Sequence, residues 1–217
     1  DGELEIEIDI DDETRCLTVR DNGIGMNHQE VVDNLGTIAR SGTRQFIESL
    51  TGNDAEDTRL IGQFGVGFYS SFIVADKVTL TTRRAGVDES EGVRWESTGD
   101  GEYTVETIDV PRRGTEVVLH LREDADEFLA PYRLREIVRT YADHITIPIK
   151  MLAPAAPPST EDGGDDEAAE TTPEPEWERI NSATALWARS KGDIEEDEYE
   201  AFYKHVAHDF EAPLAHT

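Results

Sequence analysis

Apolar and acidic residues alternate over the first ten positions of the chain. Every second residue from Leu4 to Ile10 is apolar, and the residues between them are Glu or Asp. This period of two is typical of a β-strand with one buried face. The polar run at 11–15 predicts a turn, and the same alternation returns at 17–19. We therefore expect a β-hairpin that ends at Asp21.

A helical period replaces this alternation after residue 28. Between residues 28 and 50, apolar side chains recur three or four positions apart, and Gly36 and Gly42 interrupt them. The pattern predicts two short helices joined by a loop that contains glycine. A segment of this kind is weakly anchored and is able to move.

Strand-like runs and one amphipathic helix fill most of the chain from residue 69 to residue 151. A glycine-rich loop leads into an apolar helix at 69–75, and a strand follows that helix. Three further runs with strand character are separated by turns that contain Gly and Asp, which predicts an antiparallel meander. The three runs are 92–98, 102–108 and 114–121, the amphipathic helix is 131–145 with Leu134, Ile137, Val138 and Tyr141 facing inward, and a closing strand is 145–151.

The composition changes after residue 152. Residues 153–176 are rich in acids, proline and small residues and carry no apolar pattern. Such a composition predicts a disordered acidic linker. Aromatic residues return in 177–217, but this segment is too short for an independent core. We expect one domain over 1–152, the linker over 153–176, and the start of a truncated further domain over 177–217.

The chain is strongly acidic. Its 217 residues include 48 Asp and Glu against 20 Lys and Arg, which gives a formal net charge of -28. Nucleic acids and anionic membranes are bound by basic surfaces, so we expect neither as a partner. No long apolar stretch and no basic-then-apolar leader is present, so we expect a cytoplasmic protein.

Cysteine and histidine give no sign of redox or metal chemistry. Cys16 is the single cysteine, so no disulfide can form within the chain, and we interpret it as a core or edge residue rather than a catalytic thiol. The six histidines show no metal-binding spacing.

The sequence DNGIGM, from Asp21 to Met26, is the first candidate site. An ionised carboxylate only accepts hydrogen bonds and adenine offers an exocyclic amino group, so a half-buried Asp21 suits recognition of a purine edge. Gly23 and Gly25 permit positive φ and a close approach of a ligand to the backbone. The sulfur of Met26 can pack on the flat base. An ordinary Asp-Asn-Gly turn at a strand end is the alternative interpretation, and for this stretch alone the more common one.

The sequence GQFGVGF, from Gly62 to Phe68, is the second candidate site. Glycines before a helix expose backbone N–H groups to an anion such as a phosphate. The stretch is not a P-loop, because no Gly-Lys-Ser/Thr follows, and it lacks the spacing of a dinucleotide fingerprint. Close packing of a helix on a sheet is the alternative explanation of its glycines.

Together, the two stretches resemble the boxes of the GHKL ATPase superfamily, which includes gyrase B, histidine kinases, MutL repair proteins and the heat shock protein 90 chaperones. LGTIARSGT at 35–43 and IGQFGVGFYSSFIVADKV at 61–78 are similar to the heat shock protein 90 branch in its bacterial form. WESTGDGEYTV, RGTEVVLHL and AFYKHVAHDF extend the resemblance to nearly the whole chain, apart from the acidic linker.

The resemblance implies a fold and a set of site residues. The fold is a two-layer α/β sandwich with a mostly antiparallel sheet, the Bergerat-type ATP-binding fold, over 1–152 without its first strand and helices. The acidic linker and the start of a middle domain follow it. The implied nucleotide-binding residues are Asp21, Gly25, Met26 and Thr115 around adenine, Asn34 near the ribose and phosphates, and Gly62, Gly65, Val66, Gly67 and Phe68 in the phosphate loop; the implied lid contains Gly36, Arg40, Ser41 and Gly42.

The resemblance also implies a limit on catalysis. In this family a helix before the first hairpin carries the Glu that activates water and the Asn that binds Mg²⁺, and neither has a counterpart in this sequence. No other acid has a motif that qualifies it as a general base. We therefore assign no catalytic residue and no metal ligand. We expect an N-terminally truncated fragment that binds ATP or ADP, with Mg²⁺ as the family's cofactor, and hydrolyses ATP poorly or not at all.

The function implied by the resemblance is that of an ATP-dependent molecular chaperone of the stress response. Lid closure and hydrolysis would drive the folding of unfolded client proteins, and two protomers would form a homodimer. One alternative is another ATPase of the superfamily, a histidine kinase or a gyrase B-like protein, although no phosphotransfer helix or basic surface accompanies the domain. The other alternative is a module that binds nucleotide or partner proteins without catalysis.

Overall fold

The computed structural model describes residues 2–36, 66–153, 176–182 and 194–207. The chain divides into two compact units, Asp1–Glu136 and Ile137–Thr217. Most of the expected lid beyond Gly36 and nearly all of the expected linker lie outside the described residues. The three expected domain boundaries stay predictions.

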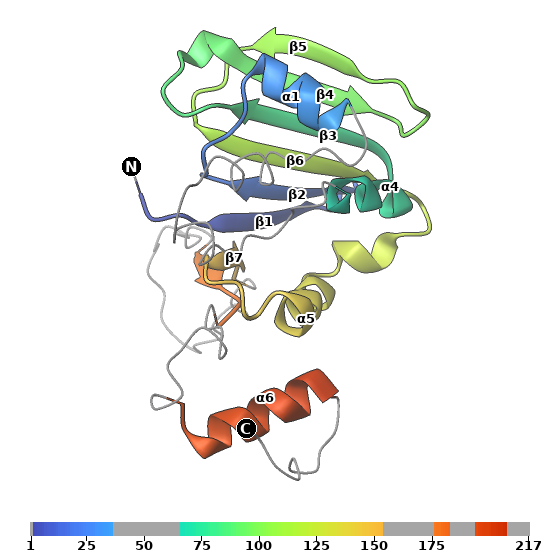
Figure 1. Ribbon diagram of the computed structural model, residues 1–217. Helices are drawn as coiled ribbons and strands as arrows, with labels where there is room; N and C mark the ends of the chain where they lie inside the picture. Colours follow the sequence, from blue (N-terminus) through green and yellow to red (C-terminus); the bar gives the residue numbers. More distant parts are fainter. Residues whose placement is uncertain (1, 37–65, 154–175, 183–193, 208–217) are drawn as a thin grey trace, which may run out of the picture. The chain divides into compact units, whose positions relative to one another are not determined.

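The first unit is built on an antiparallel sheet (Figure 1). Its described strands follow the order β5-β4-β3-β6-β2-β1, and each neighbouring pair is antiparallel. Together with the helices that accompany it, this sheet confirms the expected α/β class. The strands are β1 (Ile6–Asp11), β2 (Cys16–Asp21), β3 (Ala75–Arg83), β4 (Gly92–Ser97), β5 (Thr104–Ile108) and β6 (Gly114–Leu121), and two short 3-10 helices are η2 (Glu89–Glu91) and η3 (Asp126–Leu129).

The predicted hairpin is confirmed. β1 and β2 pair over their whole length, with Asp11 opposite Cys16 at the turn. The Oδ1 atom of Asp11 accepts hydrogen bonds from the backbone N–H groups of Glu13 and Thr14 at 2.9 and 3.1 Å. An Asp at the start of a turn commonly binds the backbone in this way, and here it fixes the register of the two strands.

The predicted meander is wrong at its last strand. β3, β4 and β5 are consecutive neighbours, but β6 returns to the middle of the sheet and pairs with β3 on one side and β2 on the other. The reason lies in the composition of the strands. β6 carries a run of apolar residues at 117–119, which suits a strand with neighbours on both sides, whereas β5 is mostly exposed and takes the edge.

The core lies between the sheet and helix α1 (His28–Leu35), which contacts β4 and β5. Figure 1 shows α1 crossing this part of the sheet. Because side chains alternate along a strand, Leu80 and Thr82 of β3 share the face that α1 covers, whereas Thr81 lies on the other face. The buried cluster contains Val31, Ala75, Val78, Leu80, Val93 and Trp95, with Met26, Leu35, Phe68 and Phe72 packed against it.

The apolar helix expected at 69–75 is shorter than predicted. A 3-10 helix, η1 (Gly67–Ser70), leads into a single turn, α4 (Ser71–Val74), and β3 begins at once with Ala75. Ala75 is buried and pairs with Leu121 of β6. Pairing with the central strand therefore takes over from helical hydrogen bonding at the first position where the sheet is within reach.

The amphipathic helix is confirmed as α5 (Pro131–Tyr141), although it ends four residues before the expected boundary at 145 and one residue expected to face inward is wrong. Leu134 and Val138 are buried, but Tyr141 is 74% exposed. Tyr141 shares their face by spacing, yet it is the last residue of the helix. Periodicity places a residue on a face, whereas burial also needs a neighbouring element that covers the same turn.

The second unit contains a short antiparallel pair, β7 (Ile149–Leu152) and β8 (Trp177–Arg179), and helix α6 (Glu196–Ala207). The expected closing strand at 145–151 starts late, because Pro148 has no N–H to donate. The buried Asn181 holds the preceding residues instead. Its Oδ1 accepts from the Ile149 N–H at 2.8 Å, and its Nδ2 donates to the carbonyls of Ile145 and Ile147 at 2.9 and 3.1 Å.

Candidate functional site

A row of three polar residues crosses the sheet where β2 ends. Asp21 of β2 lies opposite Thr115 of β6, and Thr115 lies opposite Thr82 of β3. Residues that lie opposite each other in antiparallel strands project from the same face. The row therefore lies on the face that carries Leu80 and the core, and it interrupts an apolar surface with a carboxyl and two hydroxyl groups.

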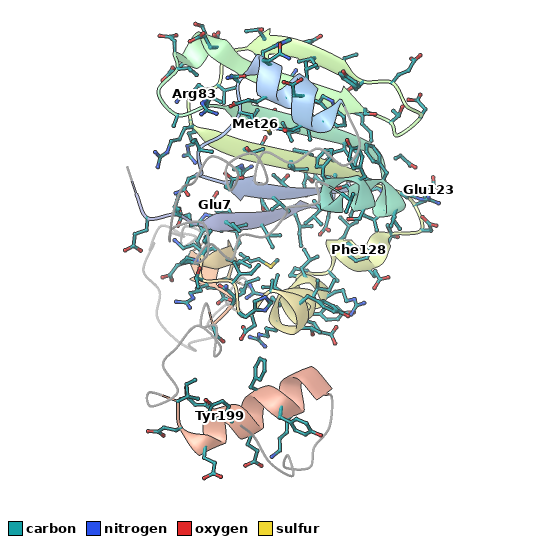
Figure 2. All side chains as sticks on the ribbon, in the orientation of Figure 1. Glu7, Met26, Arg83, Glu123, Phe128 and Tyr199 are labelled. Carbon is teal, nitrogen blue, oxygen red and sulfur yellow. The ribbon has the colours of Figure 1, made fainter. Side chains whose placement is uncertain are left out.

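The loop after β2 is fastened to the end of β3. The Met26 N–H donates to Thr82 Oγ1 at 3.0 Å, and the Ala85 N–H donates to the carbonyl of Ile24 at 2.7 Å. Gly25 has φ 65, and a Cβ at this position would overlap the carbonyl oxygen of Arg83. The labelled side chains of Met26 and Arg83 lie toward the same end of the sheet in Figure 2. The second glycine of DNGIGM is thus required both by its conformation and by its close contact.

The carboxyl group of Asp21 lies at the end of β2, among the residues that line a hollow. Its Oδ1 accepts a hydrogen bond from the Gly23 N–H at 2.8 Å. Burial raises the pKa of the carboxyl above its ordinary value of 3.8, and hydrogen bonds from the backbone N–H groups of Gly23 and Thr115 oppose that shift. The residue as a whole is exposed to solvent. A carboxylate placed in this way is available to a ligand.

A hollow with a volume of about 950 Å³ has Asp21 and Thr115 in its wall. Most of the wall comes from the polar face of the sheet and from the loop before β6. Neighbouring residues along a strand project from opposite faces of the sheet. The hollow lies mostly on the face opposite the row of Asp21, Thr115 and Thr82, and it reaches that row only at the end of the sheet. Besides Asp21, its charged lining residues are Glu5, Glu7, Arg20, Arg83, Arg94, Asp109, Arg112, Arg113 and Glu116.

Helix α1 carries Asn34 and is anchored at both ends. At its start, Asn27 and Glu30 form a capping box, and Glu30 also forms an ion pair with Arg84. At its end, the Tyr69 hydroxyl donates to the carbonyl of Leu35 at 3.2 Å. The Oδ1 atom of Asn34 is buried and has no hydrogen-bond partner among the described residues. A buried acceptor in this state fits a ligand that donates to it.

Of the other residues predicted from the sequence, some lie within the described residues and some lie outside them. Val66 is exposed, whereas Phe68 packs against the core cluster that Met26 also contacts. At Gly36, the Cα lies so close to the Tyr103 hydroxyl that a Cβ would overlap it. Arg40, Ser41, Gly42, Gly62 and Gly65 lie outside the described residues. The structure thus brings Asp21, Met26 and Thr115 together and leaves the phosphate loop and lid as predictions.

Two further observations concern absences in the described part of the chain. No group of three or more His, Cys, Asp and Glu side chains in these ranges could hold a metal ion. No helix there combines the length and the apolar character that a membrane span needs.

Comparison with known proteins places the chain in a family. The family model described as "Histidine kinase-, DNA gyrase B-, and HSP90-like ATPase" matches residues 2–125. The chain belongs to this ATPase family. The model described as "Hsp90 protein" matches residues 156–217, so the expected resemblance to the heat shock protein 90 branch is confirmed.

Similar curated relatives carry the name Chaperone protein HtpG. The chain is 60% identical to HtpG of Nitrosomonas eutropha over 217 residues, and 60% identical to that of Nitrosospira multiformis. It is 57% identical to HtpG of Coxiella burnetii over 215 residues. These alignments cover 99 to 100% of the chain but 33% of each relative. The chain therefore spans about a third of the length of the relatives it matches.

Sequence reasoning about this ATPase domain missed Thr82. The residue is 0% exposed and contacts both the DNGIGM loop and the start of β6. The available signal was the alternation along β3, where Thr82 occupies the apolar face shared by Val78 and Leu80. A polar residue in such a row has to find a hydrogen-bond partner.

Replacement of Gly25 should disrupt the ATPase domain. Gly25→Ala combines a positive φ with an overlap at the Arg83 carbonyl, so we expect it to lower the free energy of unfolding by more than about 2 kcal/mol. Gly86→Ala is the matched control, because Gly86 has φ 85 with no atom within 4 Å of its added Cβ. It should cost about 1 kcal/mol. Urea denaturation measures both, and equal effects would show that the contact with Arg83 is unimportant.

The Asp21 carboxyl should leave a pH signature. A carboxyl whose pKa is raised on folding costs no stability when protonated and lowers it as the pH rises through the folded pKa. As the pH rises from the ordinary value of 3.8 through the raised pKa of the folded state, the wild type should therefore lose stability relative to Asp21→Asn. Asp11→Asn is the control of opposite sign, since hydrogen bonds from Thr14 lower the pKa of Asp11. Thermal unfolding across this range tests both, and parallel curves for wild type and Asp21→Asn would contradict the prediction.

Proposed function

We propose that the chain binds an adenine nucleotide and that Asp21 recognises the base. The observation that carries the proposal is the position of the Asp21 carboxyl, at a sheet end, opposite Thr115 and fixed by the Gly23 N–H. An ionised carboxylate accepts hydrogen bonds only, and the exocyclic amino group of adenine donates. The two groups are therefore complementary.

The neighbouring residues support the rest of the nucleotide site. Met26 is held by Thr82 and packs beside the core, where its sulfur can contact a flat base. Asn34 supplies a buried acceptor without a partner in the described residues, which suits a ribose hydroxyl. For the phosphates we propose the backbone N–H groups of the stretch from Gly62 and Gly65 to Val66, Gly67 and Phe68.

For the intact protein we propose an ATP-dependent chaperone. The support is the printed name of its relatives, Chaperone protein HtpG, together with the ATPase and Hsp90 family matches. In this proposal the segment with Gly36, Arg40, Ser41 and Gly42 closes over the nucleotide. Closure and hydrolysis are coupled to the folding of unfolded client proteins, and the protein acts as a cytoplasmic homodimer in the stress response.

Mg²⁺ belongs to this proposal as a partner of the nucleotide. Bound to the phosphates, it would neutralise charge that develops there during hydrolysis. The residues proposed to hold the phosphates, 66–68 and Asn34, offer backbone donors and one amide rather than carboxylates. This chain's residues would thus hold the nucleotide and position its phosphates.

A second candidate is a nucleotide-binding module without catalysis. The observation that favours it for these 217 residues is that the DNGIGM box contains one carboxylate, Asp21, and this proposal assigns Asp21 to the base. A carboxylate bound to the base cannot also activate water at the phosphates. A histidine kinase or a gyrase B-like protein is less well supported, because the relatives are chaperones.

Replacement of Asp21 tests base recognition. Asp21→Asn should weaken ADP binding by about 10- to 100-fold, the effect of one hydrogen bond to a charged group. It should also reduce the preference for ADP over IDP, whose base carries an oxygen in place of the amino group. Asp109→Asn is the matched control, because this exposed acid lines the same hollow away from the Asp21 row, and it should leave affinity unchanged. Calorimetric titration decides, and unchanged affinity in Asp21→Asn would refute the proposed site.

Phosphate release tests the second candidate. The 217-residue polypeptide should release no more phosphate from ATP than a sample without protein, although ADP binds, since no residue here is assigned as general base. Full-length HtpG from Nitrosomonas eutropha serves as the comparison in the same assay. Turnover by the 217 residues at a rate similar to that of this relative would contradict the expectation.

A further inference from the structure

Thr82 lies at the centre of a small hydrogen-bond network on the inner face of the sheet. Its Oγ1 donates to the carbonyl of Gly114 at 2.8 Å, accepts from the Met26 N–H at 3.0 Å, and lies 3.1 Å from Thr115 Oγ1. The side chain is fully buried. Each of these contacts is therefore made without competition from water.

The number of protons on a hydroxyl fixes the direction of the last contact. A threonine hydroxyl has one proton to donate and two lone pairs that accept. The carbonyl of Gly114 can only accept, so the proton of Thr82 goes to Gly114. The Met26 N–H can only donate, so it takes one lone pair of Thr82. The contact between the two hydroxyls is then satisfied only if Thr115 donates to Thr82.

This direction sets what Thr115 offers to a ligand. Its single proton points to Thr82, so the Thr115 oxygen presents lone pairs alone toward Asp21 and the site. Asp21, opposite Thr115 in the strand register, is also an acceptor when ionised. The row therefore presents acceptors side by side. An amino group with two N–H donors matches such an edge, and a carbonyl oxygen is repelled by it.

We propose that Thr82 is a positioning residue that determines specificity: it holds the hydroxyl proton of Thr115 away from the ligand and so selects 6-amino over 6-oxo purines. This inference rests on the proposed nucleotide site. Thr82 itself does not touch the base. It acts through Thr115, and through Met26 it fixes the loop that follows Asp21.

The test uses the ratio of ADP affinity to IDP affinity in the full polypeptide that carries this sequence. Thr82→Val removes the hydroxyl and keeps the branched shape, so Thr115 is free to rotate and donate to the oxygen of hypoxanthine. We expect the ratio to fall about tenfold, as for one ordinary hydrogen bond. Thr82→Ser keeps the hydroxyl, and its ratio should stay within about twofold of wild type. Thr81→Val, on the opposite face of β3, should leave the ratio unchanged.

The ratio separates this role from a merely structural one. Loss of a buried hydroxyl also lowers stability, but a smaller folded fraction changes the stoichiometry of binding and not the ratio of two affinities. In a Thr115→Val background, Thr82→Val should change the ratio no further, since its effect passes through Thr115. A ratio that stays at the wild-type value in Thr82→Val overturns the inference.

Thr115→Val alone provides a test that does not depend on the folding of a Thr82 variant. If Thr115 accepts a hydrogen bond from the base, its loss weakens the binding of ADP more than that of IDP, and the ratio of ADP affinity to IDP affinity falls. If Thr115 donates a hydrogen bond to the base, its loss weakens the binding of IDP and the ratio rises. That result overturns the inference. Failure of the proposed function looks different from either result. In that case the wild type itself does not bind ADP, or Asp21→Asn binds it as well as the wild type does.

Discussion

The buried hydroxyl of Thr82 is the point at which the fold and the candidate site depend on each other. It ties the loop after β2 to β3 through Met26, and it ties β3 to the first residue of β6 through Gly114. These segments are 56 and 32 residues away from Thr82 in the sequence. The DNGIGM loop keeps its conformation because Thr82, in the sheet, accepts its Met26 N–H. The proposed ligand-binding groups of that loop are held in position by the same contact.

One face of the sheet packs against the core and the other carries ion pairs. A shift of the strand register by one residue would exchange the two sets of side chains. On the face opposite the core, Arg20 is paired with Glu7 and Glu116 on the adjacent strands, and Lys77 lies 2.9 Å from Glu96. Such half-exposed pairs each contribute little stability. Their effect is on register, because a slip would bury these charges and expose the apolar residues. The same register sets Asp21 opposite Thr115. The ion pairs of the polar face therefore help to position the candidate site on the other face.

The sequence predicts local features well and long-range neighbours poorly. Alternating acids and apolar residues are sufficient for the β1–β2 hairpin, and helical spacing is sufficient for α1 and α5, because those signals lie within a few residues of each other. The position of β6 between β3 and β2 depends on which surfaces the finished sheet must bury. Thr82 was missed for the same reason: its role is defined by atoms of Met26 and Gly114, and nothing next to it in the sequence indicates them.

The acidity of the chain and the chemistry of the proposed ligand are compatible for a physical reason. A nucleotide joins a neutral base to an anionic tail, and in this chain of net charge -28 the stretch proposed for the tail, from Gly62 to Phe68, contains no Lys or Arg. Carboxylate and hydroxyl acceptors can recognise the base through its amino group without any positive side chain. The tail then requires donors without charge, and closely approached backbone N–H groups of a glycine-rich stretch supply these. Burial of Asp21 makes its charge costly in the free protein. In the proposed complex, an adenine amino group that donates to this carboxylate would offset that cost.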